Sequence, residues 1–186
     1  MSERIVDGKG RGYEAEVNHN NKLEVFSVSE NEMTFISQKD GDAFMFATAN
    51  HIDIPIADTV YGVFYLQNTS ETKNLYIESL RTCSTAVNLW NLYKNPTTST
   101  VIDDQTAGVK NTLNFTSAST PDANVYQGTG TNFTGGSLLE NWVNDVGHST
   151  EKYGGAIILG KNDSIGVSAK LKASGDACIR VVGYYL

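Results

Sequence analysis

Short apolar segments separated by polar turns, at intervals of about ten residues, constrain the fold of this chain more than any other feature. Residues 62–67 (GVFYLQ) form a continuous apolar run and are followed by the turn-like stretch NTSETKN. Residues 164–171 alternate, with Ile165, Val167 and Leu171 on one face, which predicts a half-buried antiparallel strand. A series of such strands and turns indicates an all-β fold, either an antiparallel β-sandwich or a barrel.

Other segments predict strands less clearly. Residues 74–83 alternate imperfectly, because Leu75, Ile77, Ser79 and Arg81 fall on one face and Tyr76, Glu78 and Leu80 on the other. Residues 86–94 carry apolar groups on both faces, as a strand between two layers does. Residues 137–146 fit a helical turn or two as well as a strand, and 96–134 predict loops with one or two short strands. Further strands are expected within residues 42–56, 154–160 and 177–186.

The composition favours a folded core and argues against two classes of partner. The chain has 186 residues, of which 40% are hydrophobic, enough for one domain with a real core. Its formal net charge of −7 disfavours nucleic acid as a partner, since that binding rests largely on Lys and Arg that neutralise phosphates. No apolar run approaches the roughly 18 residues that span a bilayer, so we expect no signal peptide and no membrane partner.

The glycine-rich run IVDGKGRGYEAEV, residues 5–17, raises the choice between a phosphate-binding loop and an arm. A phosphate-binding loop lies between a buried strand and a helix, so that backbone N–H groups converge on the anion. Only seven residues precede Gly8, and the residues after Gly12 alternate like a strand, so neither neighbour is visible. We therefore interpret the run as part of an arm and expect no nucleotide cofactor.

The two cysteines, Cys83 and Cys178, lie 95 positions apart and show no metal-binding spacing. Two interpretations are open. A buried pair of small thiols is the favoured one, and a disulfide that links distant strands is the alternative.

The acidic residues and histidines form no pattern that predicts catalysis. His148 has Asp145 and Glu151 nearby, but a solvated loop is the favoured interpretation. Asp103 and Asp104 lack the spacing of a calcium-binding loop. We therefore predict a protein that is not an enzyme, with no catalytic residues, no metal and no cofactor.

Aromatic residues suggest a second possible function. On a β-sandwich they could form a platform that stacks on sugars, whereas packing in the core or at a subunit interface is favoured because the rings lie within apolar alternation. The residues concerned are Trp90, Tyr126, Trp142, Tyr153, Tyr184 and Tyr185.

Several short motifs in the first 80 residues occur together. They are VDG at 6–8, GRG at 10–12, NKLEV at 21–25, VSE at 28–30 and GDAF at 41–44, followed by YLQNTSETKNLYIESL at 65–80. In this order they resemble the opening of virion structural proteins encoded by tailed bacteriophages. The closing strands are similar more loosely, and residues 96–134 have no counterpart.

The resemblance implies a particle component with a jelly-roll-like β-sandwich, residues 41–186, behind an extended N-terminal arm, residues 1–40. It implies a decoration or cement protein on the phage head shell, in virions assembled in the cytoplasm of a bacterial host. Its partners would be itself, as a homotrimer, and the major capsid protein or another virion protein. A tail or fibre component whose sandwich binds a receptor or glycan is the alternative.

The arm is the candidate surface for binding the shell. Glycine lets a backbone approach a neighbour closely, and alternating residues can add a strand to the edge of a neighbour's sheet. The slightly basic tip of an otherwise acidic protein suits an acidic groove. The candidate contact residues are Arg4, Ile5, Val6, Lys9, Arg11, Tyr13, Val17, Leu23 and Val25.

Overall fold

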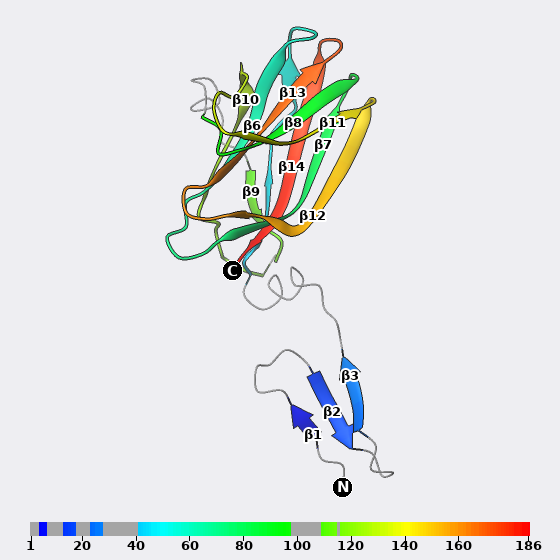
Figure 1. The fold of residues 1–186 in the computed structure, drawn as a ribbon, viewed down its shortest axis with the longest axis vertical. Helices are drawn as coiled ribbons and strands as arrows, with labels where there is room; N and C mark the ends of the chain where they lie inside the picture. Colours follow the sequence, from blue (N-terminus) through cyan, green and yellow to red (C-terminus); the bar gives the residue numbers. More distant parts are fainter. Residues whose placement is uncertain (1–3, 7–12, 18–22, 28–40, 98–108, 115) are drawn as a thin grey trace.

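Two antiparallel β-sheets pack face to face, and three short N-terminal strands form a small sheet of their own (Figure 1). The computed structural model describes residues 4–6, 13–17, 23–27, 41–97, 109–114 and 116–186. For the three N-terminal ranges and for Val109 it describes the backbone alone. Its described residues contain no helix, and so none long and apolar enough to cross a membrane. The prediction of an all-β antiparallel sandwich is confirmed.

Most strands of the sandwich overlap segments that the sequence predicts as strands, with shifted bounds. The small sheet consists of β1 (Arg4–Val6), β2 (Tyr13–Val17) and β3 (Leu23–Ser27). The sandwich consists of β4 (Ala43–Ala47), β5 (Ile52–Ile54), β6 (Val60–Asn68), β7 (Leu75–Ser84), β8 (Asn88–Lys94), β9 (Val109–Thr112), β10 (Ala123–Thr131), β11 (Ser137–Asn144), β12 (Gly147–Leu159), β13 (Ser164–Leu171) and β14 (Gly175–Tyr185).

The strand order is that of a jelly roll. The five-stranded sheet has the order β10-β6-β13-β8-β11, and the six-stranded sheet β12-β7-β14-β4-β9, with β5 also paired to β14. The pairs β4–β14, β6–β13, β7–β12 and β8–β11 are nested in the sequence and alternate between the two sheets. This is the pairing of one long hairpin folded over into two layers. The connection from β8 to β11 contributes β9 and β10, one edge strand to each sheet.

The core lies between the two sheets and is almost entirely apolar. Trp90 on β8 is fully buried and is the largest side chain in it. Phe44 and Phe46 on β4 point into the core from the six-stranded sheet, and Phe64 and Leu66 on β6 point into it from the five-stranded sheet. Inward and outward residues therefore alternate along the strands, as in a sandwich whose inner faces interdigitate.

A β-bulge explains the imperfect alternation of β7. The register against β14 shifts between Val182, opposite Ser79, and Gly183, opposite Ile77, which leaves Glu78 as an extra residue. Ile77 and Leu80 therefore both face the core, although alternation predicts opposite faces. The prediction that Ser79 and Arg81 share a face with Ile77 is wrong, because the bulge turns both of them to the outer face of the sheet.

Aromatic clusters cover part of each outer face. On the five-stranded sheet, Phe133 packs with Tyr65, Tyr93 and Tyr126. A Cβ on Gly166 would lie 2.8 Å from the Phe133 ring. Only glycine at position 166 therefore lets this ring pack against the sheet. On the six-stranded sheet, a second cluster, with Tyr76 stacked on Tyr184, lies near the C-terminus and leaves the other end of that face open.

Candidate interaction surfaces

The predicted arm residues lie on the three strands of the small sheet, except for two. Lys9 and Arg11 fall outside the described residues, as does most of the predicted arm. The others are Arg4, Ile5 and Val6 on β1, Tyr13 and Val17 on β2, and Leu23 and Val25 on β3. The three strands pair with one another, β1 with β2 and β2 with β3, in antiparallel fashion.

The register of the small sheet separates apolar from charged residues. Ile5, Ala15 and Val25 are direct cross-strand neighbours, and Val17 is the neighbour of Leu23. Of the two alternate rows, one consists of the charged residues Arg4, Glu16 and Glu24, and the other of Val6, Glu14 and Phe26. Since successive residues of a strand belong to opposite faces, one face of this sheet is predominantly apolar and the other is rich in charge.

The six aromatic residues do not come together as one platform. Trp90, Tyr184 and Tyr185 are buried, and Trp142 and Tyr153 are partly buried against the main core. Tyr126 belongs to the cluster around Phe133 on an outer face. Packing was the favoured interpretation of these rings, and the structure agrees with it.

A lateral edge of the sandwich carries half of the large aliphatic side chains that are exposed among the described residues. β11 and β12 are the terminal strands of their sheets and lie along the same side of the molecule (Figure 1). Val143 is 68% exposed and Val146, in the turn between the two strands, is 64% exposed. We call this surface the β11 edge patch; its members are Leu138, Leu139, Val143 and Val146.

The backbone under the patch is well anchored. Trp142 and Trp90 are direct cross-strand neighbours on β11 and β8, so the inner face of the edge strand is held by the core. The Tyr153 hydroxyl on β12 donates a hydrogen bond of 2.9 Å to the Glu140 carboxylate on β11. Burial, together with that carboxylate, raises the pKa of Tyr153 above its usual range, so the hydroxyl stays protonated as a donor.

Sequence reasoning missed this patch, although a signal was present. Residues 137–146 hold more apolar residues than one face of a strand can bury. For this reason the sequence did not decide between a helix and a strand. The structure shows a strand with a register shift between Leu138 and Glu140. The surplus apolar residues face solvent.

The cysteines form a disulfide between adjacent strands. Cys83 on β7 and Cys178 on β14 are direct cross-strand neighbours with Cα atoms 5.1 Å apart. The interpretation as a buried pair of free thiols is wrong. Separation along the chain does not reveal that the jelly-roll topology places these two strands side by side.

Glu151 does not share a face of its strand with His148. His148 lies on β12 opposite Cys83, and Glu151 lies opposite Leu80, whose side chain faces the core. Alternation therefore puts His148 and Glu151 on different faces of the strand. Among the described residues no three His, Cys, Asp or Glu side chains are grouped to hold a metal ion; Asp103 and Asp104 lie outside them.

Two candidate interaction surfaces among the described residues are thus an edge with exposed aliphatic residues and an N-terminal sheet with one apolar face. Both are suited to contact with other proteins, and neither resembles a catalytic centre. Comparison with protein-family models, with curated proteins and with solved structures found no match.

Proposed function

We propose that this chain is a structural subunit of a bacteriophage particle, a decoration or cement protein that self-associates as a homotrimer and binds the head shell. The observation that carries the proposal is the β11 edge patch, because aliphatic side chains gathered on an open sheet edge mark a site of association. The jelly-roll topology and the resemblance of the first 80 residues to phage virion proteins support it. The proposal gives the chain no catalytic role and no nucleic-acid or membrane partner.

The N-terminal strands supply the contact with the shell in this proposal. A three-stranded sheet with one apolar face needs a second layer to cover that face. No described strand of the sandwich pairs with it. The major capsid protein, or another virion protein, is the proposed cover.

Charge placed in the β11 edge patch should abolish self-association. With Val143→Glu and Val146→Glu combined, association should weaken at least about a hundredfold, because burying an unpaired carboxylate costs several kcal/mol and each 1.4 kcal/mol is about tenfold. Ile56→Glu is the matched control, since Ile56 is 59% exposed in the connection between β5 and β6. Analytical ultracentrifugation measures all three proteins. A monomeric parent chain, or equal association of the double variant, contradicts the proposal.

Removal of residues 1–40 should abolish binding to the shell while the sandwich stays folded. Electron cryomicroscopy of particles from cells that express the chain with its neighbouring virion genes should show the full chain on the head exterior. Residues 41–186 alone should be absent from the particles, although they keep the thermal midpoint and the oligomeric state of the full chain. Equal decoration by both forms would show that the N-terminal strands are not the anchor.

A tail or fibre component that binds a receptor or glycan is the second candidate. Its original basis, an aromatic platform, is not assembled, because most of the six rings lie in or against the core. A groove on the outer face of the six-stranded sheet, lined by polar residues that include Arg81, Asp176 and Arg180, is the observation that favours it. Density at the tail alone in the same micrographs would select this candidate.

A further inference from the structure

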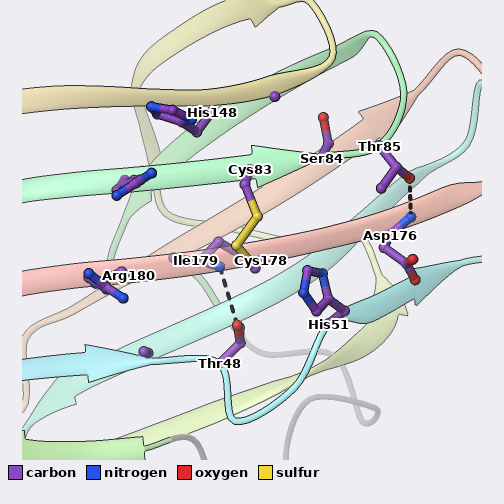
Figure 2. A pocket seen from close by; sticks show the side chains of 13 residues that line it. Thr48, His51, Cys83, Ser84, Thr85, His148, Asp176, Cys178, Ile179 and Arg180 are labelled. Carbon is purple, nitrogen blue, oxygen red and sulfur yellow. Dashed lines mark hydrogen bonds between the residues drawn. A yellow bond between two sulfur atoms is a disulfide. The ribbon is translucent and has the colours of Figure 1, made fainter.

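A groove of about 410 Å³ lies on the outer face of the six-stranded sheet (Figure 2). Its lining residues on β14 belong to the first half of that strand, away from the C-terminus. Its volume falls within the range of about 300–1,000 Å³ that is common for small-molecule sites. The Cys83–Cys178 disulfide joins the two strands that line its centre. Its lining includes the polar side chains of Thr48, His51, Arg81, Ser84, Thr85, His148, Asp176 and Arg180.

Two arginines lie side by side in this groove. Arg81 on β7 and Arg180 on β14 are direct cross-strand neighbours, and both are exposed. Such residues have Cβ atoms about 4.5–5.5 Å apart, and like charges at this spacing destabilise a sheet. Within the described part of the chain, neither guanidinium has an ion pair or a hydrogen bond. An anion held by both would relieve their repulsion, and guanidinium groups bind carboxylates and phosphates through paired hydrogen bonds.

More nitrogen donors lie around the arginine pair on the same outer face. On β12, His148 lies opposite Cys83, and Lys152 lies opposite Ser79, one row beyond Arg81. His51 reaches the groove from the segment between β4 and β5, close to Cys178 (Figure 2). The positive charges of Arg81, Arg180 and Lys152 occur together on a protein whose net charge is −7, so the groove is a local site for an anion on an acidic molecule.

The far side of the groove offers hydrogen bonds of a different kind. The Thr48 hydroxyl accepts a bond from the Ile179 N–H at 3.3 Å, and the Thr85 hydroxyl accepts one from the Asp176 N–H at 2.8 Å. Each threonine hydroxyl therefore keeps its proton to donate. The Asp176 carboxylate, with Asp53 as its cross-strand neighbour, can accept bonds from hydroxyl groups.

We propose that this groove binds an acidic saccharide, a sugar that carries a carboxylate, phosphate or sulfate group. Arg81 and Arg180 hold the anionic group, and Thr48, Thr85 and Asp176 bind the hydroxyl groups of the ring. The site does not depend on the proposed shell-binding role, because none of its lining residues belongs to the β11 edge patch, although Val146 of the patch directly precedes Gly147 of the lining.

Calorimetric titration of the full chain tests the ligand class. Glucuronate, N-acetylneuraminate and glucose 6-phosphate are the acidic probes, glucose is the neutral control, and acetate and inorganic phosphate represent the anion alone. At least one acidic sugar should bind tenfold more tightly than glucose and tenfold more tightly than its matching simple anion. If no acidic sugar binds, if glucose binds equally well, or if acetate or phosphate binds as tightly as the sugars, the proposal is overturned.

Single substitutions then test the site. Arg81→Gln and Arg180→Gln should each weaken the binding of that sugar at least tenfold and leave the thermal midpoint unchanged or raised, because each removes a like-charge contact. Lys161→Gln is the matched control; Lys161 is exposed, pairs with Glu71 and lies outside the groove, so its loss should leave sugar binding unchanged. Unchanged binding by both arginine variants, or an equal loss in the control, overturns the assignment of the groove.

Discussion

Replacing Trp90 with alanine should lower the free energy of unfolding by about 3–5 kcal/mol, the range found when large buried aromatic residues are truncated. Trp90 is fully buried on β8, a central strand of the five-stranded sheet, and the six-stranded sheet covers it from the other side of the core. Its truncation leaves a cavity that the paired strands around it cannot close by moving, because β8 is hydrogen-bonded on both sides, to β13 and β11.

Trp142 provides the matched control for this cavity. It is the cross-strand neighbour of Trp90, but it lies on the terminal strand β11 and is only partly buried. Trp142→Ala should therefore cost less than half as much, since solvent and the strand edge can fill the space. Urea denaturation followed by fluorescence measures both variants, with far-ultraviolet circular dichroism as the second probe. Equal losses for the two variants would mean that Trp90 is not the centre of the core.

The local pattern of apolar and polar residues was sufficient to place most strands. Where it failed, the position of the strand in its sheet explains the failure. Strict alternation located β13 within residues 164–171, and the apolar run at 62–67 located β6. The bulge in β7 could not be foreseen, because it depends on the register against β14. Residues 154–160 were predicted as a buried strand, yet they end the terminal strand β12, and Ile158 is 48% exposed.

The candidate surfaces were harder to predict than the strands for the same reason. Arg81 and Arg180 are 99 positions apart in number, and only the pairing of β7 with β14 makes them neighbours. The exposure of Val143 and Val146 could not be predicted, because a sequence does not reveal which strand ends a sheet.

Loss of the Cys83–Cys178 disulfide should lower the free energy of unfolding by about 2–4 kcal/mol, the usual range for a bond that closes a long loop. The bond restricts the unfolded chain across a separation of 95 residues, which includes most of the sandwich. The double variant Cys83→Ala with Cys178→Ala should show this loss. Dithiothreitol should produce the same loss in the parent chain and no change in the double variant. A parent chain that is insensitive to dithiothreitol would contradict the role assigned to the bond.

The size of this loss also bears on where the protein can assemble. Bacterial cytoplasm keeps thiols reduced, so a subunit that assembles there, as proposed, folds without the bond. Domains of this size are commonly stable by about 5–15 kcal/mol, and a loss of 2–4 kcal/mol leaves such a fold in place. The double variant should therefore be folded and keep the oligomeric state of the parent chain, while its thermal midpoint falls. If the double variant is unfolded, the disulfide must form before the subunit assembles. Folding in a reducing compartment would then be excluded.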